Sequence, residues 1–298
     1  KYASENVVCS HYMVLKQIYY RGNLIHGITG DYPFRLPVAH PPLSITSQCI
    51  VVEYSSGELR AIDLTDCNDD ILLCTLLENF TGAMVFQYNP DRIKQKAEFI
   101  NSKLQKPPFT EPSKLHPGCY STRGYYTVES DDVLQFDKYV TKENPKLYFR
   151  GLRTNAMRSS LQYLAKYPDA EVYENRIETV KYFAEFGSHK IALGLPGQGD
   201  LCFRDFEAFA LKIPLLRPEY SVTLSKPLIP DFHYVKVNAR NSNDMEMLAE
   251  DIMKRYYEVI QDQAFLEFIA KNAFEYYMNF GTYEKIAEQC FEFLQPTI

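Results

Sequence analysis

From residue 146 onward the chain alternates short apolar runs with amphipathic segments long enough to form helices, and this alternation constrains the fold more than any other feature. It predicts βαβ units, because two parallel strands need a crossover long enough to hold a helix. Helices then cover both faces of a parallel sheet, which is the arrangement of an α/β Rossmann-like domain. The expected strands are residues 147–149, 170–173, 190–195, 213–216 and 234–237, and the expected helices are residues 156–166, 177–186 and 204–211.

The first half of the chain has a less regular α/β pattern, which proline-rich stretches interrupt at residues 33–42 and 107–117. The pattern of apolar and polar residues changes from irregular to regular at residues 142–145, so we expect two domains, residues 1–143 and residues 144–298. In the first domain the expected strands are residues 49–54, 59–64 and 83–88, and the expected helices are residues 70–79 and 90–106.

The end of the chain, residues 243–294, has an almost wholly helical pattern. Apolar residues recur there at helical spacing within residues 248–260 and again within residues 265–274. Such a stripe favours core packing over a partner-binding surface. We expect the final helix to cross back to the first domain.

An open parallel sheet binds its ligand in the crevice outside the carboxyl ends of its strands. The loops at residues 150–155 and 196–204 follow two of the expected strands, so both are expected to face the ligand. The first loop and the helix start after it carry Arg150, Arg153 and Arg158. Guanidinium groups suit the bidentate grip that a pyrophosphate offers, which favours phosphate binding; a solvated helix start is the alternative, above all for Arg153.

The second loop contains Gly197, Gly199 and Asp200, and the helix that follows carries Arg204 and Glu207. Glycines let the backbone approach a ligand closely, and a helix N-terminus directs free N–H groups at an anion. Arg204 in the first turn is mildly unfavourable beside the positive end of the helix dipole, so its presence indicates an anionic partner. The alternative is a plain turn, since the stretch has neither a Walker sequence nor GxGxxG spacing.

The charge and composition of the chain exclude some partners. A formal net charge of −6 gives no global positive field for nucleic acid or an anionic membrane, so local basic residues must meet any phosphate. No run approaches the ~20 apolar residues of a membrane-spanning helix, and we expect no transmembrane segment. The seven cysteines are scattered without a CxxC pair, which indicates reduced thiols in a cytoplasmic or cytosol-like compartment.

The order of the motifs resembles a known family. The motifs are Phe149-Arg150-Gly151 at a strand end, then Arg158, then the glycine loop followed by Arg204 and Glu207 in one helix. In this order they resemble the donor half of GT-B glycosyltransferases of the protein O-glucosyltransferase (capsule-associated) type and, more loosely, the exostosin family. The resemblance covers about residues 79–293.

This resemblance implies a GT-B fold, in which two Rossmann-like domains face a cleft and the C-terminus is helical. It implies a nucleotide-sugar donor, with UDP-glucose or UDP-xylose as the guess, and a hydroxyl of a glycan or glycoprotein as acceptor, in a cytosolic bacterial or large-DNA-virus enzyme. Arg204 is expected on a phosphate and Glu207 on the ribose or base side. Together with Arg153, the expected donor-binding residues are Arg150, Gly151, Arg158, Gly197, Gly199, Asp200, Arg204 and Glu207.

Inversion at the anomeric carbon requires a base that takes a proton from the acceptor hydroxyl. In GT-B enzymes this base comes from the N-terminal domain, where Asp66 is the first candidate and Asp63 the second. Turn and helix-cap roles are the alternative for this acidic cluster, and His26 and Asp31 are competing bases. The aspartates form no DxD metal motif, so we expect neither a metal nor a cofactor besides the donor.

Two other functions stay open at this point. The first is another Rossmann-type transferase or a nucleotide-dependent oxidoreductase, against which the missing glycine fingerprint counts. The second is a non-catalytic nucleotide- or sugar-binding protein, which would keep the donor pocket without a base.

Overall fold

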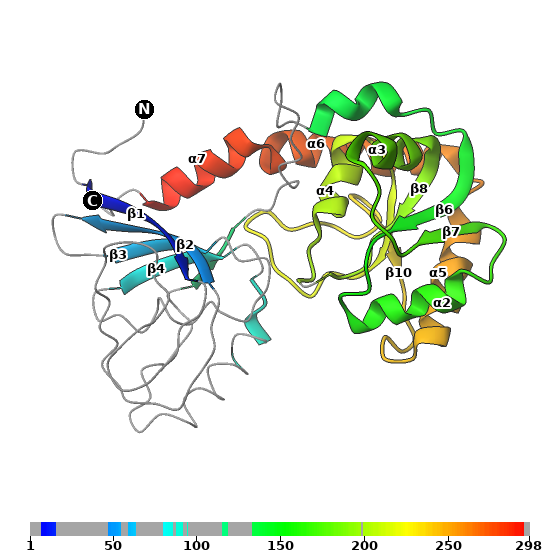
Figure 1. Cartoon of the computed structure of the whole chain (residues 1–298), viewed down its shortest axis with the longest axis horizontal. Coiled ribbons are helices and arrows are strands. Elements are labelled where there is room, and N and C mark those ends of the chain that lie inside the picture. The colour runs from blue at the N-terminus through cyan, green and yellow to red at the C-terminus, as the bar shows by residue number, and fades with distance from the viewer. Residues whose placement is uncertain are drawn as a thin grey trace. The chain divides into compact units, whose positions relative to one another are not determined.

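The computed structural model describes residues 7–15, 47–54, 59–63, 80–85, 88–91, 94, 115–118, 133–197 and 199–294. The chain forms two compact units (Figure 1). The first unit contains residues 1–119, 222–225 and 287–298, and the second contains residues 120–221 and 226–286. Each unit has its own sheet.

The first unit contains a five-stranded mixed sheet with the order β1-β2-β3-β4-β5. β1 and β2, and likewise β2 and β3, pair antiparallel, whereas β3, β4 and β5 pair parallel. The parallel pairing expected of a Rossmann-like domain is therefore found at β3–β5. The strands are β1 (Val7–Leu15), β2 (Ser47–Tyr54), β3 (Leu59–Asp63), β4 (Phe80–Val85) and β5 (Leu115–Pro117).

Two later segments of the chain belong to this first unit. Helix α7 (Tyr283–Leu294) begins in the second unit, and its residues from Ala287 onward belong to the first, as expected for the final helix. Arg60 Nη1 of β3 donates to the carbonyl of Phe293 at 2.7 Å. In the other segment, the backbone N–H of Thr223 donates to the carbonyl of Tyr88 at 2.7 Å.

The second unit confirms the expected parallel sheet and the helical end of the chain. Its five strands are all parallel, in the order β10-β9-β8-β6-β7. The chain passes from β6 to its neighbour β7 on one side and then returns to β8 on the other side of β6. The strands are β6 (Asn144–Arg150), β7 (Ala170–Tyr173), β8 (His189–Leu193), β9 (Leu215–Pro218) and β10 (Val235–Val237).

The helices of the second unit close both faces of this sheet. Leu147 and Phe149 point into a buried apolar cluster that includes Leu248 and Ile252 of α5. Tyr148, between them in sequence, points to the other face, where its ring lies 5.9 Å from that of Phe186 in α3. This alternation is the period of a strand. The helical segments are η2 (Val133–Tyr139, 3₁₀), η3 (Ala156–Ser160, 3₁₀), α2 (Leu161–Leu164), α3 (Thr179–Ser188), α4 (Phe203–Ala210), α5 (Met245–Val259), α6 (Gln263–Tyr276) and the π-helical η4 (Tyr277–Gly281).

The compact units divide earlier in the chain than the expected boundary at residues 143 and 144. Phe136 in η2 stacks on Phe183 in α3 with ring centroids 4.0 Å apart. The backbone N–H groups of Thr141 and Lys142 both donate to the carbonyl of Gly187. The residues just before 143 are therefore held by the second unit.

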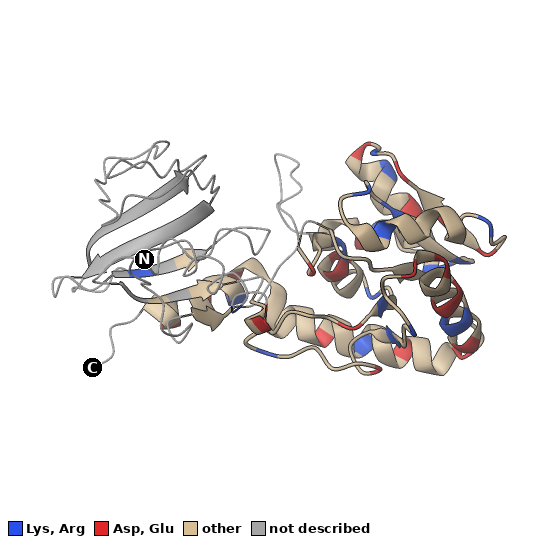
Figure 2. Cartoon of the chain, turned by 90° about the horizontal axis from the view of Figure 1, so that it is seen from below, with Lys and Arg blue, Asp and Glu red and all other residues tan. Residues whose placement is uncertain are grey.

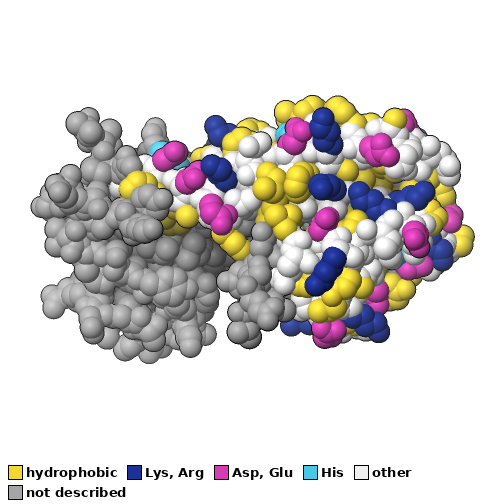
Figure 3. Space-filling model, turned by 90° about the horizontal axis from the view of Figure 1, so that it is seen from above, with side chains coloured by type: hydrophobic (Ala, Val, Ile, Leu, Met, Phe, Trp, Pro, Cys, Tyr) yellow, Lys and Arg dark blue, Asp and Glu magenta, His cyan; other side chains and the backbone are white. Residues whose placement is uncertain are grey.

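Charges of both signs are spread over the second unit. Figure 2 shows acidic and basic residues interleaved along its helices. The face drawn in Figure 3 carries apolar, acidic and basic side chains side by side. Within the described part of the chain, no helix is both long enough and apolar enough to cross a membrane.

Side chains cover the free edge of the terminal strand β10. The backbone N–H of Lys236 donates to Asp231 Oδ1 at 3.0 Å, and Arg255 Nε donates to the carbonyl of Lys236 at 3.1 Å. Arg255 and Asp231 also form an ion pair at 3.0 Å. An exposed strand edge offers unpaired backbone groups to other chains. Asp231 and Arg255 bind the N–H and the carbonyl of Lys236, so these two groups are not available for strand pairing.

We predict that Arg255→Ala accelerates amide hydrogen exchange in β10. The lost hydrogen bond to a backbone carbonyl lowers the local opening free energy by about 1 kcal/mol, which corresponds to roughly fivefold faster exchange. The control is Lys271→Ala, because Lys271 only forms an exposed ion pair with Glu275 at 3.9 Å. Equal exchange rates in both variants would show that Arg255 does not protect the edge.

Candidate functional site

The candidate site lies at the carboxyl ends of β6 and β8. The connection after β6 leads to one side of the sheet, and the connection after β8 leads to the other. In α/β sheets this switch point is where a ligand crevice forms. β6 ends at Arg150, and residues 194–202 lead from β8 into helix α4. The sheet therefore brings the two loops expected from the sequence to one edge.

Arg204, the second residue of α4, lies closest to the switch point. Its guanidinium lies over the ring of Phe149, 4.4 Å from the centroid, and its Nη2 donates to the carbonyl of Arg150. Its Nε and Nη1 are buried and have no hydrogen-bond partner among the described residues. A Cβ at position 151 would lie 2.5 Å from Arg204 Nη2, so Gly151 is what lets the side chain pass.

The local environment keeps Arg204 charged. Burial opposes the charged form, but the neighbouring Tyr182, Cys202 and Glu207 raise the pKa of Arg204 above its ordinary value. No ion pair joins Arg204 to a carboxylate among the described residues. A buried cation in this state gains when an anion or water completes its hydrogen bonds.

Arg158 is the second buried cation and joins the two loops. Its Nη1 donates to the carbonyl of Leu152 at 2.6 Å and to Thr154 Oγ1 at 3.1 Å, and its Nη2 donates to the carbonyl of Leu195 at 3.2 Å. Burial and then the charge of Arg204 lower the pKa of Arg158. The two arginines are therefore close enough to repel each other, which an anion between them would relieve.

Arg150 and Arg153, which were expected on the diphosphate, both have protein carboxylates as partners. Arg150 Nη2 pairs with Glu185 Oε2 at 2.6 Å, its Nη1 donates to Asn175 Oδ1 at 2.6 Å and its Nε donates to Tyr148 Oη at 3.2 Å. Arg153 is 44% exposed and pairs with Glu174. The diphosphate role of both residues stays a prediction, and their present contacts bind them to the protein.

Asp200 and Glu207 also point to protein partners. Asp200 Oδ1 accepts from Arg217 Nη2 at 2.8 Å, and Asp200 Oδ2 accepts from Ser221 Oγ at 2.9 Å. Glu207 is 1% exposed, and its Oε2 accepts from the hydroxyl of Tyr182 at 2.8 Å. In the glycine loop the N–H of Gly197 donates to the carbonyl of Gly199 at 2.8 Å, which closes a tight turn.

Arg217 is a residue of this region that the sequence analysis missed. It lies on β9, is fully buried and pairs with both Asp205 and Asp200. A signal was present, since Arg217 is a charged residue at the end of an apolar strand. A charge at such a place needs partners, because an unpaired buried ion is strongly unfavourable.

The expected catalytic residues fall in the first unit. Asp63 is the last residue of β3, opposite Cys49 of β2 and Val85 of β4. Asp66, His26 and Asp31 lie outside the described residues. The assignment of a base therefore stays a prediction. Of the residues described, no three His, Cys, Asp or Glu side chains are grouped so that they could hold a metal ion.

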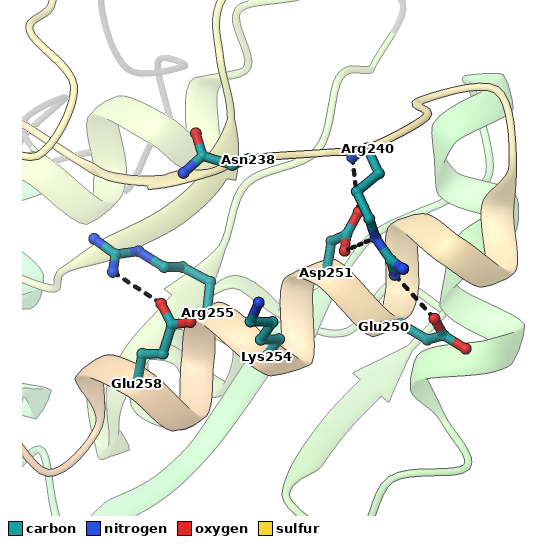
Figure 4. A pocket seen from close by; sticks show the side chains of 7 residues that line it. All are labelled: Asn238, Arg240, Glu250, Asp251, Lys254, Arg255 and Glu258. Carbon is teal, nitrogen blue, oxygen red and sulfur yellow. Dashed lines mark hydrogen bonds and ion pairs between the residues drawn. The ribbon is translucent and has the colours of Figure 1, made fainter.

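A separate pocket of about 340 Å³ lies between the end of β10 and helix α5 (Figure 4). Its three carboxylates all accept hydrogen bonds from its two arginines, as the dashed lines show. The remaining side chains, Lys254 and Asn238, are exposed, so no desolvated group selects a ligand there. The lining residues are Asn238, Arg240, Glu250, Asp251, Lys254, Arg255 and Glu258.

Comparison with protein-family models gives no match, and a search of curated proteins gives none either. Solved structures do match. The C-terminal domain of a glycosyl transferase group 1 family protein (LpcC) from Francisella tularensis aligns over 53% of this chain and 96% of its own, with 15% identity and a TM-score of 0.34. Sucrose-phosphate synthase from Thermosynechococcus elongatus aligns over 74% and 59%, with 13% identity and a TM-score of 0.46.

A third similar structure is the pneumococcal O-GlcNAc transferase GtfA in complex with UDP and GlcNAc, over 81% of this chain and 48% of its own, with 9% identity and a TM-score of 0.40. The chain thus spans less than two thirds of the synthase and of GtfA. None of the three is described as a protein O-glucosyltransferase or an exostosin, so that resemblance stays a prediction. At these identities and TM-scores the likenesses do not identify a function.

The thiol of Cys202 provides a test of the site's burial. Burial and then the nearby Asp205 raise the pKa of Cys202 to about 11. Relative to an ordinary thiol, the reactive thiolate is about 100-fold scarcer between pH 7 and pH 9, and it becomes abundant only above pH 11. We therefore predict that iodoacetamide alkylates Cys202 far more slowly in the native chain than in urea, by peptide mass spectrometry at pH 8. Equal rates would show that this thiol is accessible and the site open.

Proposed function

We propose that the chain is a glycosyltransferase that binds the diphosphate of a nucleotide-sugar donor at the carboxyl ends of β6 and β8. It transfers the sugar to a hydroxyl of a glycan or protein acceptor. The proposed donor is a UDP-linked sugar, with glucose or xylose as the guess, and the reaction inverts the anomeric carbon without a metal. The reduced thiols support a cytosol-like compartment.

The observation that carries this proposal is the state of Arg204. At the start of α4 the half-buried Arg204 has two buried guanidinium nitrogens without a described partner and no carboxylate paired with it. The N-terminal end of a helix adds a positive dipole at the same place. A diphosphate supplies the negative oxygens that both features lack. The guanidinium of Arg158 lies over the same Phe149 ring as that of Arg204, at 5.5 and 4.4 Å from its centroid.

The nucleoside end of the donor is proposed to lie toward Glu207. This residue is one turn after Arg204 on α4, beside Tyr182 of α3. Carboxylates accept hydrogen bonds from ribose hydroxyls. Because Glu207 is only 1% exposed, such a contact requires a local rearrangement on donor binding.

The first test compares two arginine variants in the binding of UDP by isothermal titration calorimetry. We expect Arg204→Gln to raise the dissociation constant at least tenfold, since a charge-assisted hydrogen bond contributes about 1.5–3 kcal/mol. Arg240→Gln is the matched control and should stay within about twofold, because Arg240 lies in the separate pocket and its ion pair with Glu250 is exposed.

Three outcomes of this titration would contradict the proposal. If wild-type protein binds none of the common nucleoside diphosphates, the site is not a donor site. If binding disappears with a chelator and returns with manganese, the metal-independent part is wrong. If Arg240→Gln weakens UDP as much as Arg204→Gln does, the phosphate is held elsewhere.

The catalytic base is proposed to be Asp66, with Asp63 next. Asp66→Asn keeps the side-chain shape but removes the proton acceptor, so UDP affinity should stay unchanged while sugar transfer falls by the ~10²–10⁴-fold usual for a lost general base. The matched variant Asp63→Asn should have the smaller effect. Sugar transfer is measured by NMR of the product. If both variants transfer the sugar at the wild-type rate, His26 and Asp31 become the next candidates for the base.

The alternative function is a non-catalytic nucleotide- or sugar-binding protein. It shares the Arg204 site, so UDP binding alone does not separate the two. Incubation with UDP-glucose and UDP-xylose does, because a transferase releases UDP by transfer or slow hydrolysis. A chain that binds UDP tightly and releases none from either sugar over several hours would support the alternative.

A further inference from the structure

The largest fully buried side chain of the second unit is Arg217, directly behind the glycine loop. We propose that Arg217 is a positioning residue for the anion site. Through Asp200 and Asp205 it holds the end of the glycine loop and the first turn of α4 in the conformation that binds a phosphate. This inference rests on the proposed function and deepens it, because it names what keeps that site preformed.

All three nitrogens of the Arg217 guanidinium have partners. Nη1 donates to Asp205 Oδ2 at 2.6 Å, Nη2 to Asp200 Oδ1 at 2.8 Å and Nε to the carbonyl of Pro218 at 2.9 Å. The ring of Tyr220 stacks on the group, with its centroid 3.3 Å from the guanidinium carbon. The side chain therefore has one fixed orientation.

The Asp200 end of this arrangement connects the loop to the chain after β9. Asp200 Oδ2 accepts hydrogen bonds from both the backbone N–H and the hydroxyl of Ser221. Asp200 itself follows Gly199 and precedes Leu201 and Cys202, which lead into α4. A bond to Arg217 on one oxygen and to Ser221 on the other fixes the loop at its last residues.

The Asp205 end fixes the first turn of the helix. Asp205 Oδ2 accepts from the backbone N–H of Cys202 at 3.3 Å and from the hydroxyl of Tyr220 at 3.3 Å. This is the reciprocal part of a capping box, which defines where α4 begins. Arg204 lies between the two fixed points, one residue before Asp205.

β9 gives Arg217 a rigid base. The strand pairs with β8 on one side and β10 on the other, and Arg217 lies opposite Lys236 of β10. A positioning group on a central strand moves little, so it transmits the geometry of the sheet to the loop. The carboxylates lie on the glycine loop and on α4, and the cation lies on the strand.

The fraction of molecules in the binding-competent conformation determines the apparent affinity for a phosphate ligand. If the loop and first turn hold the competent conformation only a tenth of the time, the apparent dissociation constant of a phosphate ligand rises about tenfold. Asp200 is the place to test this. Removing Arg217 would leave two buried carboxylates unpaired, whereas removing Asp200 leaves the Arg217–Asp205 pair intact.

The experiment uses the full chain with Asp200→Ala and, as a matched control, Glu219→Ala. Glu219 is a carboxylate of the same connection after β9 but is 59% exposed and pairs with Lys236. Titration calorimetry with UDP and with inorganic pyrophosphate measures affinity. Amide hydrogen exchange at residues 199–205 measures how often the loop and the first turn of α4 open. The melting temperature without ligand measures the stability of the fold.

We expect Asp200→Ala to weaken both ligands about tenfold, with faster exchange at residues 199–205. The melting temperature should fall moderately, because Arg217 Nη2 loses a partner while the Arg217–Asp205 pair stays. Glu219→Ala should leave all three readouts unchanged. If wild type binds and Asp200→Ala binds equally well, the positioning role is overturned while the donor site stands. If wild type binds neither ligand, the donor site itself is overturned, and the positioning role with it.

Discussion

The central place of β6 between β7 and β8 determines where this molecule can bind a ligand. The chain leaves the carboxyl end of β6 toward one side, and the chain after β8 leaves toward the other, so the loops diverge at one point of the sheet. Helices cover the faces of the sheet elsewhere. The ring of Phe149 near the end of β6 then supports both Arg204 and Arg158, at 4.4 and 5.5 Å.

Four buried or partly buried arginines surround this edge, and they differ in what neutralises them. Glu185 neutralises Arg150, and two aspartates neutralise Arg217. Arg158 has carbonyl partners but no carboxylate, and Arg204 has the fewest partners of all. The field at the switch point therefore comes mainly from Arg158 and Arg204. In a chain with a net charge of −6, these two cations, which form no ion pair with a carboxylate among the described residues, are the local basic groups that could meet an anion.

Periodicity predicted most elements of the second unit, but not the 3₁₀ helix η2 and not the partners of the charged residues. The expected helix at residues 156–166 is a 3₁₀ helix followed by a short α-helix. The strand at residues 170–173 and the helix at residues 204–211 were placed correctly to within one residue, since apolar spacing and turn residues mark them. Arg150 was expected to face a ligand because it follows a buried strand. Its partner Glu185 is 35 residues away, on a helix whose rotation the sequence does not specify. In the first unit, the strand Val7–Leu15, which pairs antiparallel with β2, was not among the expected strands.

The glycines near the site also make room for charged side chains. A Cβ at Gly151 would lie 2.5 Å from Arg204, and one at Gly197 would lie 3.1 Å from Arg158. A Cβ at Gly194 would lie 3.0 Å from Asp205, the partner of Arg217. Each glycine thus faces a charged side chain, and none of them has the left-handed backbone that would require glycine for its own conformation. At residues 151 and 197 the absence of a side chain leaves room for the arginines, while close approach of a ligand to the glycine backbone stays a prediction. The glycines and the arginines therefore form one arrangement, in which the small residues set where the cations lie and the cations set what can bind.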